Sequence, residues 1–331
     1  MSWNIFDLHK LNNNYIMKNN YSNIYSFNKK ILEKTIKLLK QEQIACLPTE
    51  TVYGLAGNAY SKKAIKRIFK LKKRPRKNPL IIHYYEIKDA KKDVVLNKNF
   101  FKLYKKFCPG PITFVLKKNK TSKISSFASA NLDTVAVRFP NHKVIRTILK
   151  SINFPLAMPS ANLSSGLSPV NAFDVFEEFN KKINIIINGG KTKIGIESTV
   201  VDISGKPKIL RPGIISLVEI KKILKINLST NKSKIRSPGM LKKHYSPGIP
   251  IVLNQKPKNP DHAFIVFGKK FKKLKNYFNL SKKANLKDAA ASLYKTMRKI
   301  KKKGYKKIFI SKIPNKGPGI AINDRLKRAS K

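Results

Sequence analysis

Polar and cationic side chains gather in this chain where predicted strands end and in one basic loop. Hydroxyls, amides, a histidine and several cations recur at these places. Together they describe a pocket for a phosphorylated ligand rich in oxygen, because such a ligand needs many donors and positive charge. Taken singly, each side chain also has an ordinary explanation as a helix cap, an ion-pair partner or a solvated charge. The set is Thr51, Lys72, Arg74, Asn78, His83, Thr134, Arg138, Ser160, Asn162, Ser168, Ser198 and Arg211.

The basic loop belongs to residues 47–83, the stretch around which the rest of the chain is organised. This stretch begins LPTETVYGLAGNAY and ends KLKKRPRKNPLIIH. Between the two, Ala64, Ile65, Ile68 and Phe69 follow helical spacing, which predicts a helix over residues 61–70. A loop that leaves a helix and enters a buried strand is fixed at both ends. We therefore expect it to hold an anion.

Arginine is scarce among the basic residues, which makes its positions informative. The chain has 71 Lys and Arg residues, of which 10 are Arg. Three of these, Arg74, Arg138 and Arg211, lie in the segments described above. An Arg that stands among so much Lys indicates a planar, two-pronged contact that Lys cannot reproduce. Thr134 and Arg138 are four residues apart on one predicted strand, so they should face the same side.

No protein nucleophile can be identified in the sequence. There is no GxSxG motif, and neither Cys46 nor Cys108 lies near a His. Gly190-Lys191-Thr192 resembles the end of a P-loop, but Ile185 stands where that motif needs Gly. No His and Cys residues have the spacing of a zinc site. The sequence therefore predicts binding and positioning groups, and we assign no metal ligand.

The elements that must position these groups alternate between strand and helix, which predicts an α/β fold. Helices are expected over residues 28–43, 97–107, 141–150, 168–179, 216–224 and 285–302. Strands are expected over 44–47, 112–116, 132–139, 155–158, 183–187, 198–203, 208–210, 262–267 and 308–310. We divide the chain into an N-terminal extension (1–27), a catalytic domain (28–228), a linker with two Pro-Gly pairs (229–250) and a small C-terminal domain (251–331).

The charge and the cysteines bear on partners and compartment. A net charge of +54 suggests contact with nucleic acid, although Lys spread over every surface-type position is also what an AT-rich coding bias would produce. Weak or non-specific binding of tRNA or double-stranded RNA remains open. No apolar run is long enough to span a membrane. The two isolated cysteines fit a reducing cytoplasm.

A series of motifs in a fixed order resembles the threonylcarbamoyl-adenylate synthase family. They are PTETVYGL, KxRPxxNPLIxH, PGPITFVL, TVAVRFP, PSANxSxxxSP, GGxxxxGxESTVVD and ILRPG, followed by SPGMxxxHYSP, which is similar to the long, two-domain form. The match covers about residues 28–250, and the tail GPGIAINDRLKRAS resembles the end of that form. Lys73 and Met158 depart from the family pattern.

The resemblance implies a reaction in which L-threonine, bicarbonate or CO2, and ATP give threonylcarbamoyl-AMP and pyrophosphate. This would be the first step of N6-threonylcarbamoyladenosine formation at position 37 of tRNAs that read A-starting codons, completed by a separate transferase. Mg²⁺ should accompany ATP. The implied fold is a twisted, open mixed sheet with a concave, positive cavity, followed by a small Rossmann-like domain.

The resemblance also implies roles for individual residues. The threonine-binding residues would be Thr51, His83, Arg138 and Ser198. The ATP-binding residues would be Lys72, Arg74, Asn78, Thr134, Ser160, Asn162, Ser168, Arg211 and Tyr245. Lys72 and Arg74 are expected on the phosphates that react. Glu50 and Glu197 could be metal ligands or structural residues, and the sequence does not decide between them.

Two alternatives stay open at this point. A carbamoyl-adenylate step in hydrogenase maturation uses a related domain, but it goes with cysteine-rich zinc repeats that two isolated cysteines do not provide. A double-stranded-RNA-binding module without catalysis would exploit the positive charge. Independently of these, we expect residues 237–250 to fold over the ATP site as a lid, with Tyr245 on the nucleotide and Gly239 and Gly248 as hinges. An ordinary interdomain connector is the alternative.

Overall fold

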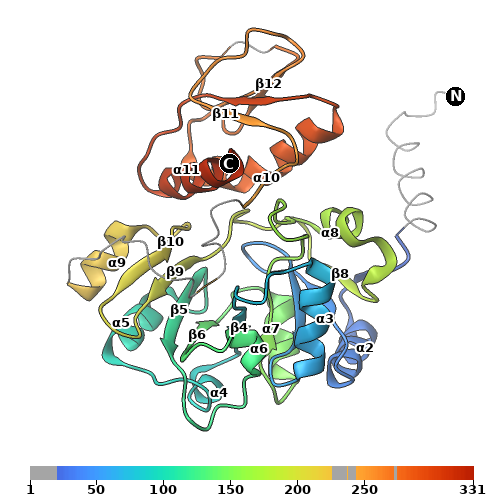
Figure 1. Cartoon of the computed structure of the whole chain (residues 1–331), viewed down its shortest axis with the longest axis vertical. Coiled ribbons are helices and arrows are strands. Elements are labelled where there is room, and N and C mark those ends of the chain that lie inside the picture. Colours follow the sequence, from blue (N-terminus) through green and yellow to red (C-terminus); the bar gives the residue numbers. More distant parts are fainter. Residues whose placement is uncertain (1–20, 226–236, 238–243, 272–273) are drawn as a thin grey trace, which may run out of the picture.

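The computed structural model describes residues 21–225, 237, 244–271 and 274–331, and it divides them into a large and a small domain (Figure 1). The large domain contains a ten-stranded sheet and the small domain a four-stranded sheet. The α/β fold with two domains is therefore confirmed. Most of the predicted linker, residues 229–236 and 238–243 with Gly239, lies outside the described residues.

The large sheet is mixed, with parallel and antiparallel neighbours. In spatial order its strands are β1 (Ile24–Ser26), β8 (Ile186–Asn188), β2 (Ala45–Leu47), β3 (Gly54–Asn58), β7 (Leu156–Ala157), β4 (Ile81–His83), β6 (Thr134–Arg138), β5 (Ile112–Lys117), β9 (Thr199–Asp202) and β10 (Lys208–Arg211). The central strands are buried on both faces, which is why they are short apolar runs without alternation.

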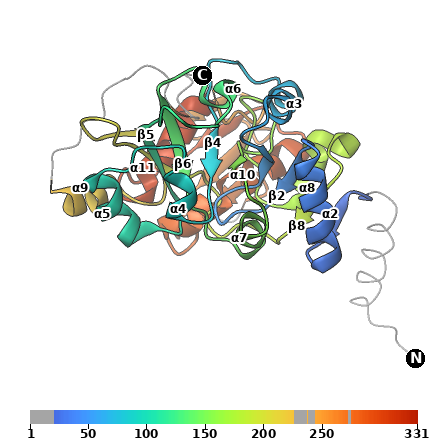
Figure 2. The same cartoon turned by 90° about the horizontal axis from the view of Figure 1, so that it is seen from below.

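The helices of the large domain cover this sheet. They are α2 (Lys29–Lys40), α3 (Lys62–Lys72), α4 (Ile87–Ala90), α5 (Lys98–Phe107), α6 (Ser126–Ser129), α7 (Lys143–Lys150), α8 (Ala172–Phe179) and α9 (Leu217–Leu224). Helix α2 packs on α7, α3 on α6, and α5 on α9. Seen from below, they lie around the strands (Figure 2).

Side-chain caps explain where most of these helices begin. Asn28, Ser61 and Asn97 each accept a hydrogen bond from a backbone N–H in the first turn of their helix. Ser216 and Glu219 form a capping box at the start of α9, which was expected over residues 216–224. Helix α7 begins at Lys143 rather than at residue 141, because His142 Nδ1 accepts a hydrogen bond from the backbone N–H of Val144 at 3.3 Å and caps the helix.

The N-terminal boundary also needs correction. Residues 1–27 are predicted to lie outside the fold, yet Ile24–Ser26 forms the edge strand β1, which pairs in parallel with β8. Its neighbour Asn23 is buried and donates hydrogen bonds to the carbonyls of Asn180 and Ile183. The pairing spans more than 150 residues of sequence, so no local pattern could reveal it.

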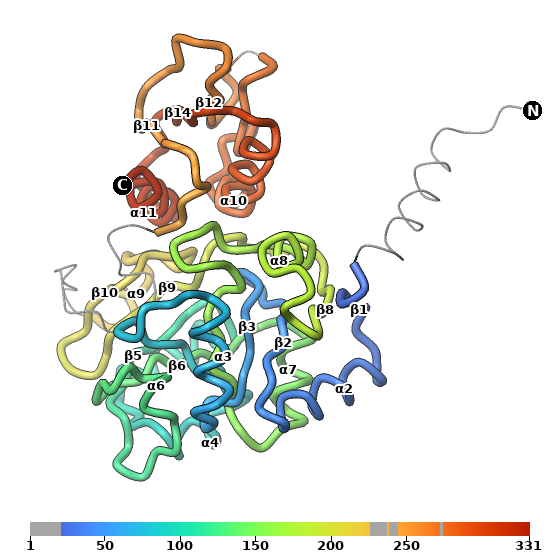
Figure 3. Tube along the Cα trace, turned by 45° about the vertical axis from the view of Figure 1, so that its right-hand side comes forward, coloured from blue at the N-terminus to red at the C-terminus, as the bar shows by residue number. Residues whose placement is uncertain are grey.

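The small domain is a parallel sheet with two long helices. Its strands lie in the order β11 (Ile251–Leu253), β14 (Ile308–Ile310), β12 (Ala263–Val266) and β13 (Tyr277–Asn279), and all neighbours are parallel. Helices α10 (Leu286–Lys302) and α11 (Pro318–Ala329) lie on the side that faces the large domain (Figures 1 and 3). The parallel order and the helices agree with a small Rossmann-like unit.

The two domains share a continuous apolar cluster. Val52, Leu167, Val170 and Ile196 of the large domain are buried in the same cluster as the inner faces of α10 and α11. Gly195 is so close to α10 that a Cβ there would lie 2.6 Å from the Cα of Ala291. No helix in the part of the chain described here is long and apolar enough to cross a membrane.

Candidate active site

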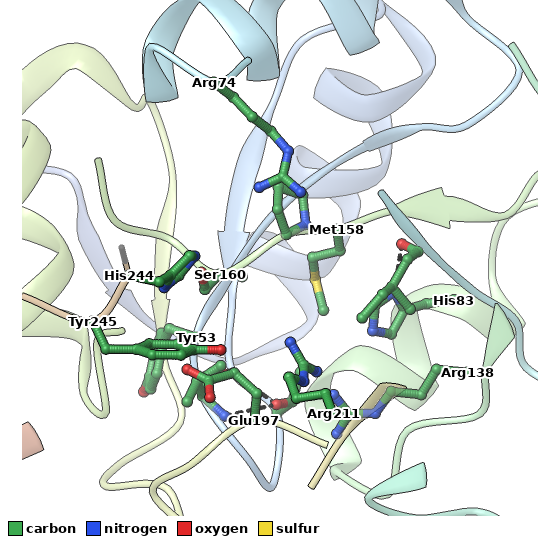
Figure 4. Close-up of a pocket in the computed structure, with 15 residues that line it drawn as sticks. Tyr53, Arg74, His83, Arg138, Met158, Ser160, Glu197, Arg211, His244 and Tyr245 are labelled. Atoms are coloured by element: carbon green, nitrogen blue, oxygen red, sulfur yellow. Dashed lines mark hydrogen bonds between the residues drawn. The ribbon is translucent and has the colours of Figure 1, made fainter. Parts of the chain in front are cut away.

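A cationic cavity lies in the large domain where several strand ends meet the start of the second domain (Figure 4). It has a volume of about 510 Å³, part of which is open to solvent. The residues that line it come from segments spread over two hundred positions of sequence. They are Thr49, Val52, Tyr53, Gly54, Arg74, Ile81, His83, Arg138, Met158, Pro159, Ser160, Glu197, Arg211, His244 and Tyr245.

Three arginines give the cavity its positive charge. Arg74 enters from one side and Arg138 and Arg211 from the opposite side (Figure 4). All three are almost completely buried. Burial and the charge of Arg211 lower the pKa of Arg74, so an anion bound between the two guanidinium groups would be stabilised. The cavity is therefore suited to an anionic ligand.

Arg74 and Arg211 are held in place by fixed acceptors. Arg74 donates from Nε to the carbonyl of Asn78 at 2.9 Å and from Nη2 to that of Pro79 at 2.8 Å. Arg211 donates from Nε to the carbonyl of Ser198 and from Nη2 to its Oγ, both at 3.1 Å. Neutral carbonyl and hydroxyl oxygens therefore orient both guanidinium groups.

Lys72 does not line the cavity but fixes one of its walls. Its Nζ donates to the carbonyl of Ser160 at 2.6 Å and also to that of Asn162. Burial, followed by the charge of Arg74, lowers the pKa of Lys72 well below its ordinary value. In this arrangement Lys72 holds the loop that carries Ser160, while Arg74, two residues later, reaches the cavity itself.

His83 and Arg138 are neighbours across the parallel pair β4 and β6. His83 Nδ1 donates to the carbonyl of Ile81 at 3.2 Å, and among the described residues Nε2 has no partner. Burial and the charge of Arg138 lower the pKa of His83 to about 3. The imidazole is therefore neutral at physiological pH, and Nε2 can accept a hydrogen bond from a ligand.

Two hydroxyl pairs lie behind these groups. Thr51 Oγ1 is 2.9 Å from Thr49 Oγ1, which itself donates to the carbonyl of Val52 at 2.6 Å. Ser198 Oγ is 2.7 Å from Thr113 Oγ1. Thr51 and Ser198 thus lie directly behind the lining residues rather than among them.

Glu197 is the carboxylate that lines the cavity. Ser168 Oγ donates to it at 2.5 Å, and Arg325 Nε of helix α11 donates at 3.0 Å. Burial alone would raise the pKa of Glu197, but Arg325 and Arg211 outweigh burial and lower it to about 2. Glu197 is therefore ionised and already paired.

His244 and Tyr245, from the segment between the domains, cover one side of the cavity. Tyr245 has a left-handed backbone with a φ of 65°, and its side chain is almost fully buried. Its hydroxyl has no partner among the described residues. The following residue, Ser246, donates from its backbone N–H to the carbonyl of Ser165 at 2.8 Å. An aromatic ring with a free hydroxyl thus faces the cavity.

The predicted site residues fall into two groups. Arg74, His83, Arg138, Ser160, Arg211 and Tyr245 line the cavity. Thr51, Lys72, Asn78, Asn162, Ser168 and Ser198 are buried and bonded to groups beside it. Thr134 is buried at the other end of β6 from Arg138, and its Oγ1 has no partner among the described residues.

Sequence reasoning missed several residues that complete the site. Tyr53, Met158 and His244 line the cavity although the sequence predicts no role in it for them individually. Arg325 and Tyr294 reach Glu197 from the second domain. Arg325 could have been identified because Arg is scarce in this chain. Tyr294 could not, because it lies on a helix face whose spacing is typical of a hydrophobic core.

The carboxylates near the cavity do not form a metal centre. Glu50 accepts from Arg138, and Glu197 accepts from Arg325. Across the described ranges there is no group of three His, Cys, Asp or Glu side chains that could hold a metal ion. A divalent cation at this site would therefore be coordinated by ligand oxygens and water, as Mg²⁺ commonly is with phosphates.

Comparison with known proteins identifies the family. A family model described as telomere recombination (Sua5/YciO/YrdC) matches residues 37–213, and a second, described as threonylcarbamoyl-AMP synthase, C-terminal domain, matches residues 215–331. The threonylcarbamoyl-AMP synthase of Pyrococcus abyssi is 34% identical over 315 residues, covering 88% of this chain and 92% of that protein. That of Bacillus subtilis is 32% identical over 316 residues, covering 88% and 91%.

A solved structure shows the same fold over both domains. The crystal structure of P. abyssi Sua5 complexed with L-threonine has a TM-score of 0.85 and 32% identity, and the match covers 93% of this chain and 97% of that one. Both family models together run from residue 37 to residue 331, across the sheet, the cavity and the small domain. The chain therefore belongs to the threonylcarbamoyl-AMP synthase family.

Proposed function

We propose that this protein is an L-threonylcarbamoyladenylate synthase. It combines L-threonine, bicarbonate or CO2, and ATP to form threonylcarbamoyl-AMP and pyrophosphate. The observation that carries the proposal is a cavity lined by three buried arginines, in which no hydrogen bond found among the described residues pairs a lining hydroxyl with a histidine. Such a cavity suits a reaction in which the substrates supply the nucleophile and the enzyme supplies alignment and positive charge.

The threonine side of the cavity is formed by Arg138 and His83, with Thr51 and Ser198 behind them. Arg138 Nε has no partner among the described residues, so it is available to a substrate carboxylate. The neutral His83 Nε2 can accept a hydrogen bond from the substrate hydroxyl. The P. abyssi relative, whose crystal structure is complexed with L-threonine, supports L-threonine as a substrate of this protein.

The nucleotide would lie between Arg74 and Arg211, which enter the cavity from opposite sides, with Tyr245 as an aromatic surface for the base or ribose (Figure 4). Ser160 and Glu197 also line the cavity, and Ser168 is bonded to Glu197. Lys72 acts by holding the backbone of Ser160 and Asn162 next to the phosphates. The remaining residues that we assign to ATP binding are Asn78 and Thr134.

The chemistry then needs no covalent enzyme intermediate. The threonine amine takes up CO2 as a carbamate, and a carbamate oxygen attacks the α-phosphorus of ATP. The bond between the α-phosphorus and its bridging oxygen to the β-phosphorus breaks, and pyrophosphate leaves with the electron pair. Arg74 and Arg211 lie where negative charge accumulates on the leaving phosphates, which is how fixed cations accelerate phosphoryl chemistry.

Mg²⁺ belongs to this proposal as part of the ATP substrate. Both carboxylates beside the cavity are already bonded to arginines, so the phosphates and water would supply its ligands. When bound, the ion would neutralise phosphate charge. The enzyme's own contribution remains the orientation of the phosphates by Arg74 and Arg211.

The catalytic domain is proposed to run from strand β1 (Ile24–Ser26) to residue 228, followed by the linker over residues 229–250 and the small domain over residues 251–331. Residues 244–250 support a lid role for the linker, since His244 and Tyr245 line the cavity. Gly248 has a φ of 83°, which a glycine hinge adopts without strain. Closing the cavity would protect the acyl-adenylate from water.

The biological setting follows from the product. A separate transferase must move the threonylcarbamoyl group to adenosine 37 of tRNAs that read A-starting codons. Contact with tRNA itself is proposed to be weak and non-specific. The two unpaired thiols, Cys46 and Cys108, fit a reducing, cytoplasmic setting.

One assay tests the proposed function. Pyrophosphate release from ATP should require both L-threonine and bicarbonate, and mass spectrometry should find threonylcarbamoyl-AMP in the mixture. Reactions that lack either substrate serve as controls. Release of pyrophosphate without threonine, or none with all substrates present, would contradict the proposal and leave an RNA-binding module as the better reading.

A further inference from the structure

Glu197 is an unexpected group in a cavity built for an anion. Its side chain lines the cavity between Tyr245 and Arg211 (Figure 4). It is ionised, because Arg325 and Arg211 hold its pKa at about 2 against the effect of burial. A bare carboxylate here would repel a triphosphate, and the repulsion would be strong because the site is poorly hydrated. Something must compensate this charge.

The compensation comes from the small domain. Glu197 accepts hydrogen bonds from Arg325 at 3.0 Å, from Tyr294 at 3.1 and 3.2 Å, and from Ser168 at 2.5 Å. Tyr294 lies on α10 and Arg325 on α11. Two of the three donors therefore belong to the second domain, and they leave Ser168 as the donor from the catalytic domain.

Arg325 reaches two other parts of the cavity wall. Its side chain is 0% exposed, and Nη1 donates at 2.6 Å to the carbonyl of Pro212, the residue after Arg211. Its guanidinium also lies over the ring of Tyr245, 5.2 Å from the centroid. One buried side chain thus contacts Glu197, the turn that carries Arg211, and the aromatic surface of the proposed lid.

We propose that Arg325 and Tyr294 are positioning residues of the active site, which neutralise and orient Glu197 so that a triphosphate can bind beside it. Glu197 in turn orients Ser168. The second domain then completes the nucleotide side of a site whose chemistry lies in the first domain. This inference rests on the proposed placement of ATP in the cavity.

The test compares variants that differ in what they do to the charge of Glu197. Arg325→Met removes the larger of the two positive charges that compensate Glu197, so the KM for ATP should rise by about tenfold or more, while kcat changes less. The double variant Glu197→Gln/Arg325→Met removes the repelling charge and should recover most of the ATP affinity. The KM of Arg325→Lys for ATP should lie between the values for the wild type and Arg325→Met.

A matched control separates positioning from simple domain docking. Arg298, also on α10, joins the same interface but contacts Asp174 and Glu178 of α8 at 3.6 and 3.9 Å and the carbonyl of Leu167 at 2.5 Å, rather than Glu197. Arg298→Met should lower the melting temperature with little change in the KM for ATP. If Arg298→Met and Arg325→Met raise the KM equally, or if Glu197→Gln brings no recovery, Arg325 only holds the domains together and the inference is wrong.

Two further measurements keep the inference testable. If Arg325→Met does not fold, Tyr294→Phe removes one donor to Glu197 while keeping the ring, and it should weaken ATP binding severalfold; unchanged binding would refute the proposal. Calorimetric titration with a non-hydrolysable ATP analogue measures binding without turnover. An analogue that binds the wild type but loses affinity with Arg325→Met supports the inference even if the proposed reaction fails.

Discussion

Arg138 donates from Nη2 to the carboxylate of Glu50 at 2.7 Å, and both side chains are almost completely buried. The other oxygen of Glu50 accepts from the backbone N–H of Asn141 at 3.1 Å. Glu50 therefore fixes the guanidinium from behind, and Arg138 Nε is left without a partner among the described residues. A pair of this kind orients a binding group and leaves part of it for the substrate.

This relationship predicts a selective threonine site. Threonine should be used at least about 10²-fold better than valine, because a buried acceptor built for a hydroxyl is left unpaired by the analogue. Arg138→Lys should lose most activity, since an ammonium cannot bond both Glu50 and a substrate carboxylate in a plane. Pyrophosphate release with each amino acid measures both effects. Equal use of valine would show that the hydroxyl contact is misassigned.

We predict that replacing Arg74 or Lys72 by Ala lowers the reaction rate to a similar extent, but for different reasons. Arg74→Ala removes a cation from the cavity and Lys72→Ala frees the loop of Ser160, so each should slow the reaction about 10²-fold or more. Lys72→Ala should also lower the melting temperature, because the carbonyls of Asn162, which is buried, and of Ser160, which is partly buried, lose this donor. Lys77→Ala, in the same loop but exposed, is the control. If either variant keeps a near-normal rate, the replaced residue does not belong to the active site.

We predict that Tyr245, in the proposed lid, prolongs the lifetime of threonylcarbamoyl-AMP. Tyr245→Ala should weaken ATP use and speed hydrolysis of threonylcarbamoyl-AMP, because it opens the cavity to water. Tyr245→Phe keeps the ring and should retain most of the protection while losing the hydroxyl contact. Decay of the isolated intermediate in the presence of each variant is the measurement. If threonylcarbamoyl-AMP decays as slowly with Tyr245→Ala as with the wild type, the linker only connects the two domains.

The buried histidines predict that acid destabilises the fold. Burial lowers the pKa of both His83 and His244 to about 3, from an ordinary value of 6.5. The unfolded chain therefore binds more protons than the native protein between these values, and stability falls as the pH drops through that window. Each histidine can contribute up to about 1.4 kcal/mol per pH unit. Urea midpoints at several pH values should show the slope, and His83→Gln should reduce it; an unchanged slope would contradict the prediction.

The excess of Lys predicts weak, salt-dependent binding of tRNA. If the charge reflects coding bias, affinity should fall by about 10³-fold or more between roughly 50 and 200 mM salt and should not depend on the anticodon. Filter binding with matched and unmatched tRNAs measures this. Tight, anticodon-specific binding at physiological salt would instead point to a dedicated RNA surface.

Elements with strong local signals were predictable from the sequence. Helix α2, helix α5 and the capping box of α9 lie where their spacing and caps place them. Strand β3 was missed, because Gly54–Asn58 is rich in glycine and alanine and reads as a turn. It is a strand because β2 and β7 pair with it on either side. Helix α11 was missed as well, although its Pro at the first position is a common start signal.

The residues of the site likewise divide into those that the sequence could identify and those that only the folded structure reveals. Arg74, Arg138 and Arg211 could be identified because few Arg stand among many Lys. The indirect role of Lys72 could not, since its partners are backbone carbonyls some 90 residues away. The contact between Glu197 and Arg325 spans 128 residues and joins two domains, so only the folded chain brings it together.

The pairing of β1 with β8 has a consequence for how the chain folds during synthesis. Strand β2 also pairs with β8. Strands β1 and β2 therefore cannot complete their pairing until residues 186–188 have been synthesised. Until then their edges are exposed, and such edges are sites of pairing between chains. Long-range closure of this kind is slow. A net charge of +54 gives nascent chains a mutual repulsion during that interval, so the lysines would protect the unfinished sheet from aggregation.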